Sequence, residues 1–349
     1  MPTDREIRLA EGRRTRMTLA VMFTVFVVAA VLLEVLLPAG LDAREALIGM
    51  DGGIGVVTLT DGTSHPLLPA PPKGEGYAAW GLSPGRDRFV DVWYKVTGKK
   101  IEKASIQIRS ASSSRLRMEY AIEPGPFFLE SVQVGYVPGE AAIWLFDSGK
   151  LSFLEYKTGE LTEVTLKGSK EPLRMESVCF SPDQKRLAYQ PVPIMEMTTI
   201  LNEMPPLMVG DIEGTTVSDP YPLDNEWPNG VHMGVTGGAG GPNATGAMSW
   251  VDRSTLLVAG TLVDSNEGFV SSVVPRGPGD FTWTLVEGAE WEGLVVESLS
   301  ASPDSKGWAY LVRSGGAVRL GIDWNNRPDP EPFRLTTGDP RGPLRWASF

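Results

Sequence analysis

Two stretches of the sequence decide its fold: Val178 to Tyr189 reads VCFSPDQKRLAY, and Leu299 to Tyr310 reads LSASPDSKGWAY. Each has a short apolar run, then Ser-Pro-Asp and a basic residue, then a second apolar run. Proline presets φ at the first central position of a β-turn and aspartate is favoured beside it, so each stretch predicts a β-hairpin. The pattern recurs in Trp80 to Tyr94 (WGLSPGRDRFVDVWY) and, with Val-Asp-Arg at the turn, in Trp250 to Ala259 (WVDRSTLLVA). The chain is therefore predicted to be a series of repeated hairpins.

The spacing of these hairpins predicts a ring of six units. One blade of a β-propeller takes ~40 to 50 residues. Positions 80 and 178 are 98 residues apart, about two blades, so a further blade is expected to start at 132–137. The predicted blade starts are then Trp80, 132–137, Val178, Trp250, Leu299 and Trp346.

The last of these blades has room for one strand only, Leu344 to Phe349. We expect its missing strands from the other end of the propeller sequence, in Gly53 to Leu59 (GIGVVTL) and Ser64 to Leu68. Pairing the two ends closes the ring and removes the exposed sheet edges that invite aggregation. The predicted fold is all-β, a six-bladed β-propeller closed by N- and C-terminal strands. The alternative is a large sandwich or two smaller β domains.

These hairpins resemble the Ser-Pro-Asp-Gly-Lys-x-Leu-Ala repeat of the TolB-like β-propellers, six-bladed relatives of the WD-repeat proteins. In that family a Leu-Thr-x-Gly segment precedes the next blade, and Arg334 to Gly338 (RLTTG) resembles it. The sequence departs from the repeat at Gln184 and Ser305, which stand where the family has glycine. The resemblance implies a six-bladed propeller.

A long apolar stretch precedes the predicted propeller. Met17 to Leu37 (MTLAVMFTVFVVAAVLLEVLL) has Glu34 as its only ionisable group, and a helix of this length covers a hydrocarbon core of ~30 Å. Basic residues are enriched before it, which orients the N-terminus to the cytoplasm. We expect a cytoplasmic tail (1–16), a transmembrane α-helix (17–37) and a β-propeller domain (38–349) that is periplasmic or extracellular, on the inner (cytoplasmic) membrane. The basic residues before the span are Arg5, Arg8, Arg13, Arg14 and Arg16.

Two alternatives concern this stretch. A cleavable signal peptide would have a shorter apolar core of ~7 to 15 residues, so we expect a retained single-pass anchor. Glu34 lies one turn from the end of the span, where it either reaches the interface or contacts another membrane helix.

One segment, at about 191–247, interrupts the repeat and is expected to be an insertion. Long loops inside compact domains are usually functional or disordered. Its first half is rich in methionine and proline, and flexible methionine surfaces suit protein contact. We expect either a partner-binding arm or a segment packed on its own propeller. The candidate partner contacts are Ile194, Met195, Met197, Met204, Leu207 and Met208.

The sequence offers little catalytic chemistry. Gly81 to Gly85 (GLSPG) matches the G-x-S-x-G elbow of α/β-hydrolases, but a strand rather than a helix is expected after it, so we interpret it as a repeat turn. The single cysteine, Cys179, is expected in the core, and the two histidines, His65 and His232, have no metal-ligand spacing around them. No catalytic, cofactor-binding or metal residue is predicted. The net charge of −11 argues against nucleic acid as a partner.

These features favour a non-enzymatic, membrane-anchored propeller that acts as an interaction, assembly or stabilising subunit of a bacterial membrane complex, respiratory, photosynthetic or secretory. The partners would be other membrane or periplasmic subunits and, through 17–37, the bilayer. One alternative is a periplasmic small-ligand or sugar-binding sensor that uses the propeller channel, and another is a propeller hydrolase or lyase.

Overall fold

The protein divides into two units, Met1–Gly40 and Leu41–Phe349. The computed structural model describes residues 41–42, 44–137, 142–183, 185–191, 206–223, 248–261, 268–291, 295–304, 306–314, 317–324, 333–334 and 341–346. The predicted cytoplasmic tail and transmembrane helix lie outside them. None of the helices within these ranges has the length and apolar character needed to span a bilayer.

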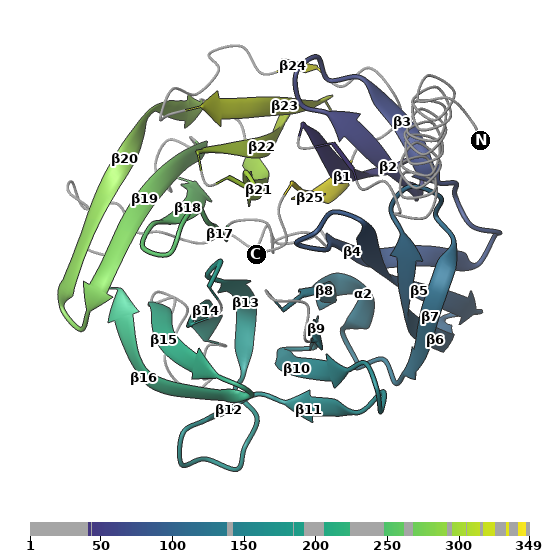
Figure 1. Cartoon of the computed structure of the whole chain (residues 1–349), viewed down its shortest axis with the longest axis horizontal. Helices are drawn as coiled ribbons and strands as arrows, with labels where there is room; N and C mark the ends of the chain where they lie inside the picture. Colours follow the sequence, from purple (N-terminus) through teal and green to yellow (C-terminus); the bar gives the residue numbers. More distant parts are fainter. Residues whose placement is uncertain are drawn as a thin grey trace, which may run out of the picture. The chain divides into compact units, whose positions relative to one another are not determined.

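The described strands form six sheets that are arranged as the blades of a ring, as predicted (Figure 1). Blade 1 contains β4 (Glu75–Leu82), β5 (Arg88–Thr97), β6 (Lys100–Ser110) and β7 (Leu116–Ile122). Blade 2 contains β8 (Gln133–Tyr136), β9 (Ala142–Asp147), β10 (Lys150–Glu155) and β11 (Leu161–Glu163), and is preceded by the short helix α2 (Phe128–Ser131). Blade 3 contains β13 (Met175–Phe180), β14 (Arg186–Pro191), β15 (Leu207–Glu213), β16 (Thr216–Leu223) and the short β12 (Thr165–Leu166).

The second half of the ring repeats this plan. Blade 4 contains β17 (Met248–Trp250), β18 (Leu256–Thr261), β19 (Gly268–Gly277) and β20 (Asp280–Trp291). Blade 5 contains β21 (Val295–Ala301), β22 (Gly307–Ser314), β23 (Ala317–Trp324) and β24 (Phe333–Arg334). Blade 6 contains β25 (Arg341–Arg345), β1 (Glu45–Met50), β2 (Gly53–Thr58) and β3 (Ser64–Leu68).

Blade 6 confirms that the two ends of the propeller share a sheet. β25 pairs antiparallel with β1, with Leu47 opposite Arg345 and Gly49 opposite Arg341. β2 and β3 match the two strands predicted at the N-terminal end, whereas β1 was not predicted. The sheet is therefore made of one C-terminal and three N-terminal strands, and it closes the ring.

A buried serine organises each Ser-Pro turn. In blade 3 the Ser181 hydroxyl donates to Asp183 Oδ1 (2.8 Å) and accepts the backbone N–H of Arg186 (3.0 Å). Ser83 and Ser302 make the equivalent pair of bonds in blades 1 and 5. These serines are almost fully buried, so the G-x-S-x-G match around Ser83 is a repeat turn, as interpreted from the sequence.

The turn of blade 4 lacks the serine and uses a carboxylate instead. Asp252 Oδ1 accepts the backbone N–H groups of Ser254 and Thr255, each at 2.7 Å. A short acceptor side chain at this point satisfies the N–H groups that the tight turn leaves free. The Val-Asp-Arg sequence thus makes the same kind of hairpin as Ser-Pro-Asp.

One boundary differs from the prediction. The segment 191–247 was predicted as one insertion, but Leu207–Leu223 supplies β15 and β16, the two outer strands of blade 3. Residues 161–166 divide between two blades, because β11 pairs in blade 2 whereas β12 pairs in parallel with β16 of blade 3. The local sequence did not reveal these pairings because both depend on contacts with distant strands.

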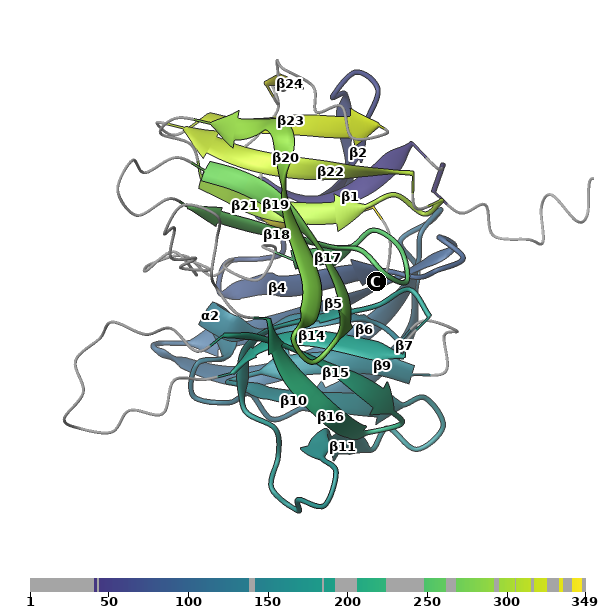
Figure 2. The same cartoon turned by 90° about the vertical axis from the view of Figure 1, so that its left-hand side faces the viewer.

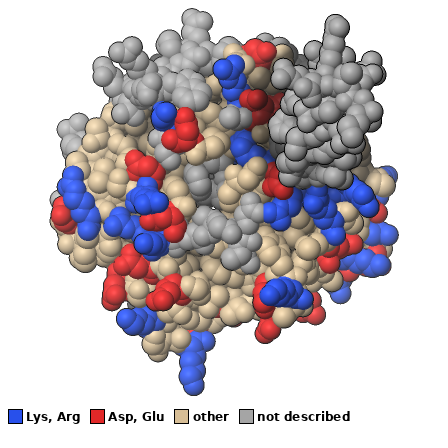
Figure 3. Space-filling model, in the orientation of Figure 1, with Lys and Arg blue, Asp and Glu red and all other residues tan. Residues whose placement is uncertain are grey.

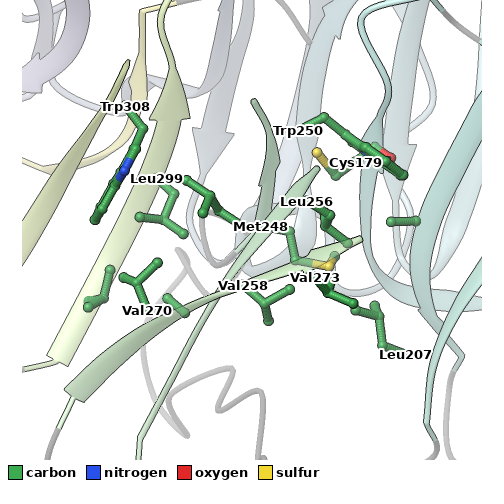
Figure 4. Close-up of a cluster of buried hydrophobic side chains, with 14 of the residues drawn as sticks. Cys179, Leu207, Met248, Trp250, Leu256, Val258, Val270, Val273, Leu299 and Trp308 are labelled. Carbon is green, nitrogen blue, oxygen red and sulfur yellow. The ribbon is translucent and has the colours of Figure 1, made fainter. Parts of the chain in front are cut away.

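The hydrophobic core runs around the ring between neighbouring blades. Figure 4 shows one of its clusters, in which Cys179, Trp250 and Trp308 come from three successive blades, 3, 4 and 5. Further clusters join blades 1 and 2, blades 2 and 3, blades 5 and 6, and blades 6 and 1. Each blade is thus stabilised by burying apolar surface on both of its faces.

The two faces of the ring carry different loops. The turns that follow the innermost strands lie on one face, which we call the turn face; Leu41 lies there, because its N–H donates to the carbonyl of Arg86 in the blade 1 turn (2.8 Å). The strands alternate in direction, so the loop Gly98-Lys99 between β5 and β6 lies on the opposite face, which we call the hairpin face. α2 lies on that face too, because it is hydrogen-bonded to Ser148 in the β9–β10 turn. Figure 2 shows the propeller from the side, with α2 at the left-hand edge.

Candidate functional site

The structure places only part of the predicted partner-contact set. Ile194, Met195, Met197 and Met204 lie outside the described residues, as does Glu34. Leu207 and Met208 belong to β15. The Leu207 side chain is buried in the core, and Met208 packs partly buried against the cluster between blades 2 and 3.

Neither Cys179 nor His65 lies in a catalytic or metal-binding arrangement of described residues. Cys179 is buried, and burial raises the pKa of its thiol to about 12, so it stays protonated and unreactive near neutral pH. His65 lies exposed on β3. In the part of the chain that the structure describes, His, Cys, Asp and Glu side chains form no cluster of three that could hold a metal ion.

The strongest surface feature is the positive charge of blade 1. Within 73–122 basic residues outnumber acidic ones two to one, although the chain as a whole is acidic. Figure 3 shows Lys and Arg side chains gathered over β5–β7, at the right of the view. Arg86 and Arg109 of this region are engaged inside the fold. We call the remaining set the basic blade surface, and its basic residues are Lys73, Arg88, Lys95, Lys99, Lys100, Lys103, Arg115 and Arg117.

The β5–β6 hairpin concentrates this charge at its tip. Gly98 takes a positive φ of 68° and allows a tight two-residue loop, Gly98-Lys99. Lys95 and Lys103 face each other directly across the two strands. Like charges in opposed positions destabilise a sheet, so local stability gives no reason for this pair. Two carboxylates offset part of this charge. Glu75 of β4 lies opposite Lys95 on the other side of β5. Glu102 lies next to Lys103, and a hydrogen bond from Thr97, and then the neighbouring lysines, lower the pKa of its carboxyl group.

Exposed apolar side chains accompany the charge. Leu116 and Met118 lie on β7, the outermost strand of blade 1, and Met118 is 47% exposed. Phe127 (60% exposed) and Leu129 lie at α2, on the hairpin face beside blade 1. Aromatic, methionine and arginine side chains are enriched in protein interfaces.

A buried ionic network stiffens the same blade. Asp91 is fully buried and pairs with Arg109, with Oδ2 2.8 Å from Nε. Arg109 also donates to Gln107, whose amide donates to Glu119 Oε1 (2.9 Å). Asp91 Oδ1 has no hydrogen-bond partner. Burial therefore outweighs the arginine and raises the pKa of Asp91 to about 7.

Sequence reasoning missed the basic blade surface because it considered the charge of the whole chain. A count in windows of one blade would have revealed it, since the residues lie between two repeat starts. The opposed lysines could not be found in this way, because their pairing depends on the register of β5 and β6.

Comparisons with known proteins support the fold. TolB from Acinetobacter baumannii superposes with a TM-score of 0.57 at 13% sequence identity, covering 89% of this chain and 67% of that one. A chain of the nidogen/laminin complex superposes with a TM-score of 0.54 at 11% identity, covering 86% of this chain and 97% of that one. No family model matches the sequence, and no curated protein matches it. At these identities the similarity shows a shared β-propeller fold.

Proposed function

We propose that this chain is a non-enzymatic interaction module, held at the inner membrane by residues 17–37, whose basic blade surface docks on an acidic surface of a partner subunit in a membrane complex. The observation that carries the docking proposal is the opposed Lys95–Lys103 pair at the tip of a basic hairpin in a chain of net charge −11. Like charges in opposed positions repel each other, Glu75 and Glu102 offset only part of this repulsion, and an acidic partner would offset the rest.

The topology keeps this tip away from the point where the chain enters the propeller. β5 starts beside the turn that binds Leu41 and runs for ten residues, to Thr97. At ~3.3 Å per residue the tip lies roughly 30 Å from that turn. A propeller tethered through residue 41 would therefore present the hairpin tip away from its tether, where another protein subunit could reach it.

The predicted contact arm would add to the same face. The segment that contains Ile194, Met195, Met197 and Met204 joins the end of β14 to the start of β15, and both ends lie on the hairpin face. Binding of protein also has precedent on this fold, since one similar chain comes from the structure of a nidogen/laminin complex.

A matched pair of charge reversals tests the docking surface. Lys99→Glu/Lys100→Glu reverses the hairpin tip, and Lys167→Glu/Lys170→Glu makes the same change in exposed lysines before β13. All three proteins, expressed in the native host and purified in mild detergent at low salt, would be compared for the subunits that co-purify. We expect the hairpin variant alone to lose its partner, and salt to release the partner from the wild type because it screens surface charges.

Equal melting temperatures of the two variants would show that the loss is not unfolding. Retention of every partner by Lys99→Glu/Lys100→Glu would contradict the proposal.

The membrane location needs a separate test. Protease added to spheroplasts of the native host should digest the propeller and leave a fragment containing 1–37 in the membrane. A propeller protected until the membrane is broken would reverse the proposed topology.

A further inference from the structure

The innermost strands of the six blades line the centre of the ring and share one register. Ser249 Oγ accepts the backbone N–H of Ala301 (2.9 Å), and Ser300 Oγ accepts that of Trp346 (2.8 Å). A Cβ added to Gly81 would meet Gly135 Cα at 2.8 Å. These contacts align one residue from each blade at one level, and five of the six are small: Gly81, Gly135, Cys179, Ser249, Ser300 and Arg345.

Arg345 is the exception, and its side chain reaches the neighbouring blade 1. Its Nε donates to the carbonyl of Trp80 there (3.3 Å). Leu344 and Trp346 on either side are buried, and Arg345 itself is mostly buried.

No described residue of the propeller neutralises the charge of Arg345. Its Nη2 atom is buried and has no hydrogen-bond partner. None of the ion pairs among the described residues involves it. Burial lowers the pKa of its guanidinium to about 10, which still leaves the group charged near neutral pH. A desolvated cation without a counter-charge is costly in a protein interior.

Two further polar groups lie one level nearer the hairpin face. Gln133 on β8 and Ser177 on β13 are buried, and neither Gln133 Nε2 nor Ser177 Oγ has a hydrogen-bond partner. Both can donate a hydrogen bond, and both lie on innermost strands, about two residues or ~7 Å along the strands from the level of Arg345.

Arg86 shows what a structural arginine in this protein looks like. It is nearly buried as well, but its guanidinium donates to four backbone carbonyls, those of Leu41, Asp42, Glu45 and Trp346. Its donors are directed at acceptors in the fold itself. Arg345 Nη2 has no such acceptor. A purely structural role would not explain why this buried donor has no hydrogen-bond partner.

We propose that the centre of the propeller binds a small oxyanion or carboxylate, held by the Arg345 guanidinium with Gln133 and Ser177 as further donors. The ligand supplies the missing negative charge and the acceptor atoms. This site lies away from the basic blade surface and does not depend on the proposed docking.

Inorganic phosphate serves as the probe. Full-length protein in mild detergent would be melted in increasing phosphate, with sodium chloride adjusted to constant ionic strength. We expect the melting temperature of the wild type to rise with phosphate and calorimetry to give one site per chain. Arg345→Met should abolish the shift, and Gln133→Leu should weaken binding several-fold while the variant stays folded, because the amide it removes has no partner. Arg319→Met, which removes an exposed arginine of β23, is the matched control and should bind like the wild type.

Three results would overturn the proposal. An equal phosphate shift in Arg345→Met and wild type would place any anion elsewhere. If neither the wild type nor Gln133→Leu bound phosphate although both were folded, Arg345 would only fill the centre of the ring and would bind no anion. Binding that is seen only after residues 347–349 are deleted would mean that the chain's own end occupies the site.

Discussion

Trp346 should be the residue on which closure of the ring depends most. Trp346 is 1% exposed and packs in the cluster between blades 5 and 6, which includes Ile48 of the N-terminal strand β1 and Leu320 of β23. Its backbone N–H donates to Ser300 of the preceding blade. Trp346→Ala removes the indole but keeps this backbone bond, so the substitution isolates the packing contribution.

The expected loss is large. Replacing a buried tryptophan by alanine costs about 3–5 kcal/mol, because the lost transfer free energy adds to that of the cavity left behind. Domains are stable by about 5–15 kcal/mol, so this is a substantial share. With an m-value of ~3 kcal/mol/M, the urea midpoint should fall by about 1–2 M.

Urea unfolding of the full-length protein in mild detergent, followed by tryptophan fluorescence and circular dichroism, would measure this shift. Leu285→Ala is the control, because Leu285 is a large apolar residue that is 44% exposed on β20. The free energy of unfolding of this variant should change by less than about 0.5 kcal/mol. If the two variants lost the same stability, Trp346 would not be packed between the two ends of the chain, and the closed ring would be wrong.

Two further predictions concern blade 1. The pKa of Asp91 is raised to about 7 in the fold, from about 3.9 in an unfolded chain, so the folded protein holds a proton that the unfolded chain has lost between these values. The stability contributed by Asp91 should therefore fall as pH rises from about 4 to 7, and the melting-temperature difference between wild type and Asp91→Asn should fall with it; a difference independent of pH would contradict the raised pKa. Gly81→Ala should destabilise the fold, because its Cβ would meet the Val134 carbonyl oxygen at 2.7 Å, whereas Gly277→Ala, which meets nothing within 4 Å, should be neutral in the same melting experiment.

The sequence predicted the features that local chemistry determines. Proline and aspartate at fixed positions set the hairpin turns, and the regular spacing then set the number of blades. β1 was missed because Glu45–Met50 has no turn signal before it and no polar alternation, since four successive residues are buried between neighbouring blades. β15 and β16 were missed because the long gap between two turns looked like one insertion.

The candidate sites were harder to predict from the sequence than the fold. The charge of blade 1 is visible in the sequence once it is counted blade by blade. Arg345 is different, because it is one arginine among many until the register of six distant strands places it opposite five small residues. Its unpaired charge is a property of the closed ring and cannot be read from spacing.

Arg86 links ring closure to the proposed function. Its carbonyl accepts the N–H of Leu41, and its guanidinium donates to carbonyls at both ends of the propeller, including that of Trp346. The start of the propeller, its last strand and the blade 1 turn are thus one hydrogen-bonded unit, from which β5 runs directly to the basic hairpin. A flexible linker would let the hairpin explore many positions, whereas this unit keeps it at a nearly constant distance from residue 41. A partner that docks on the hairpin therefore meets a preorganised surface and loses little conformational entropy in binding, which is the property required of an assembly subunit.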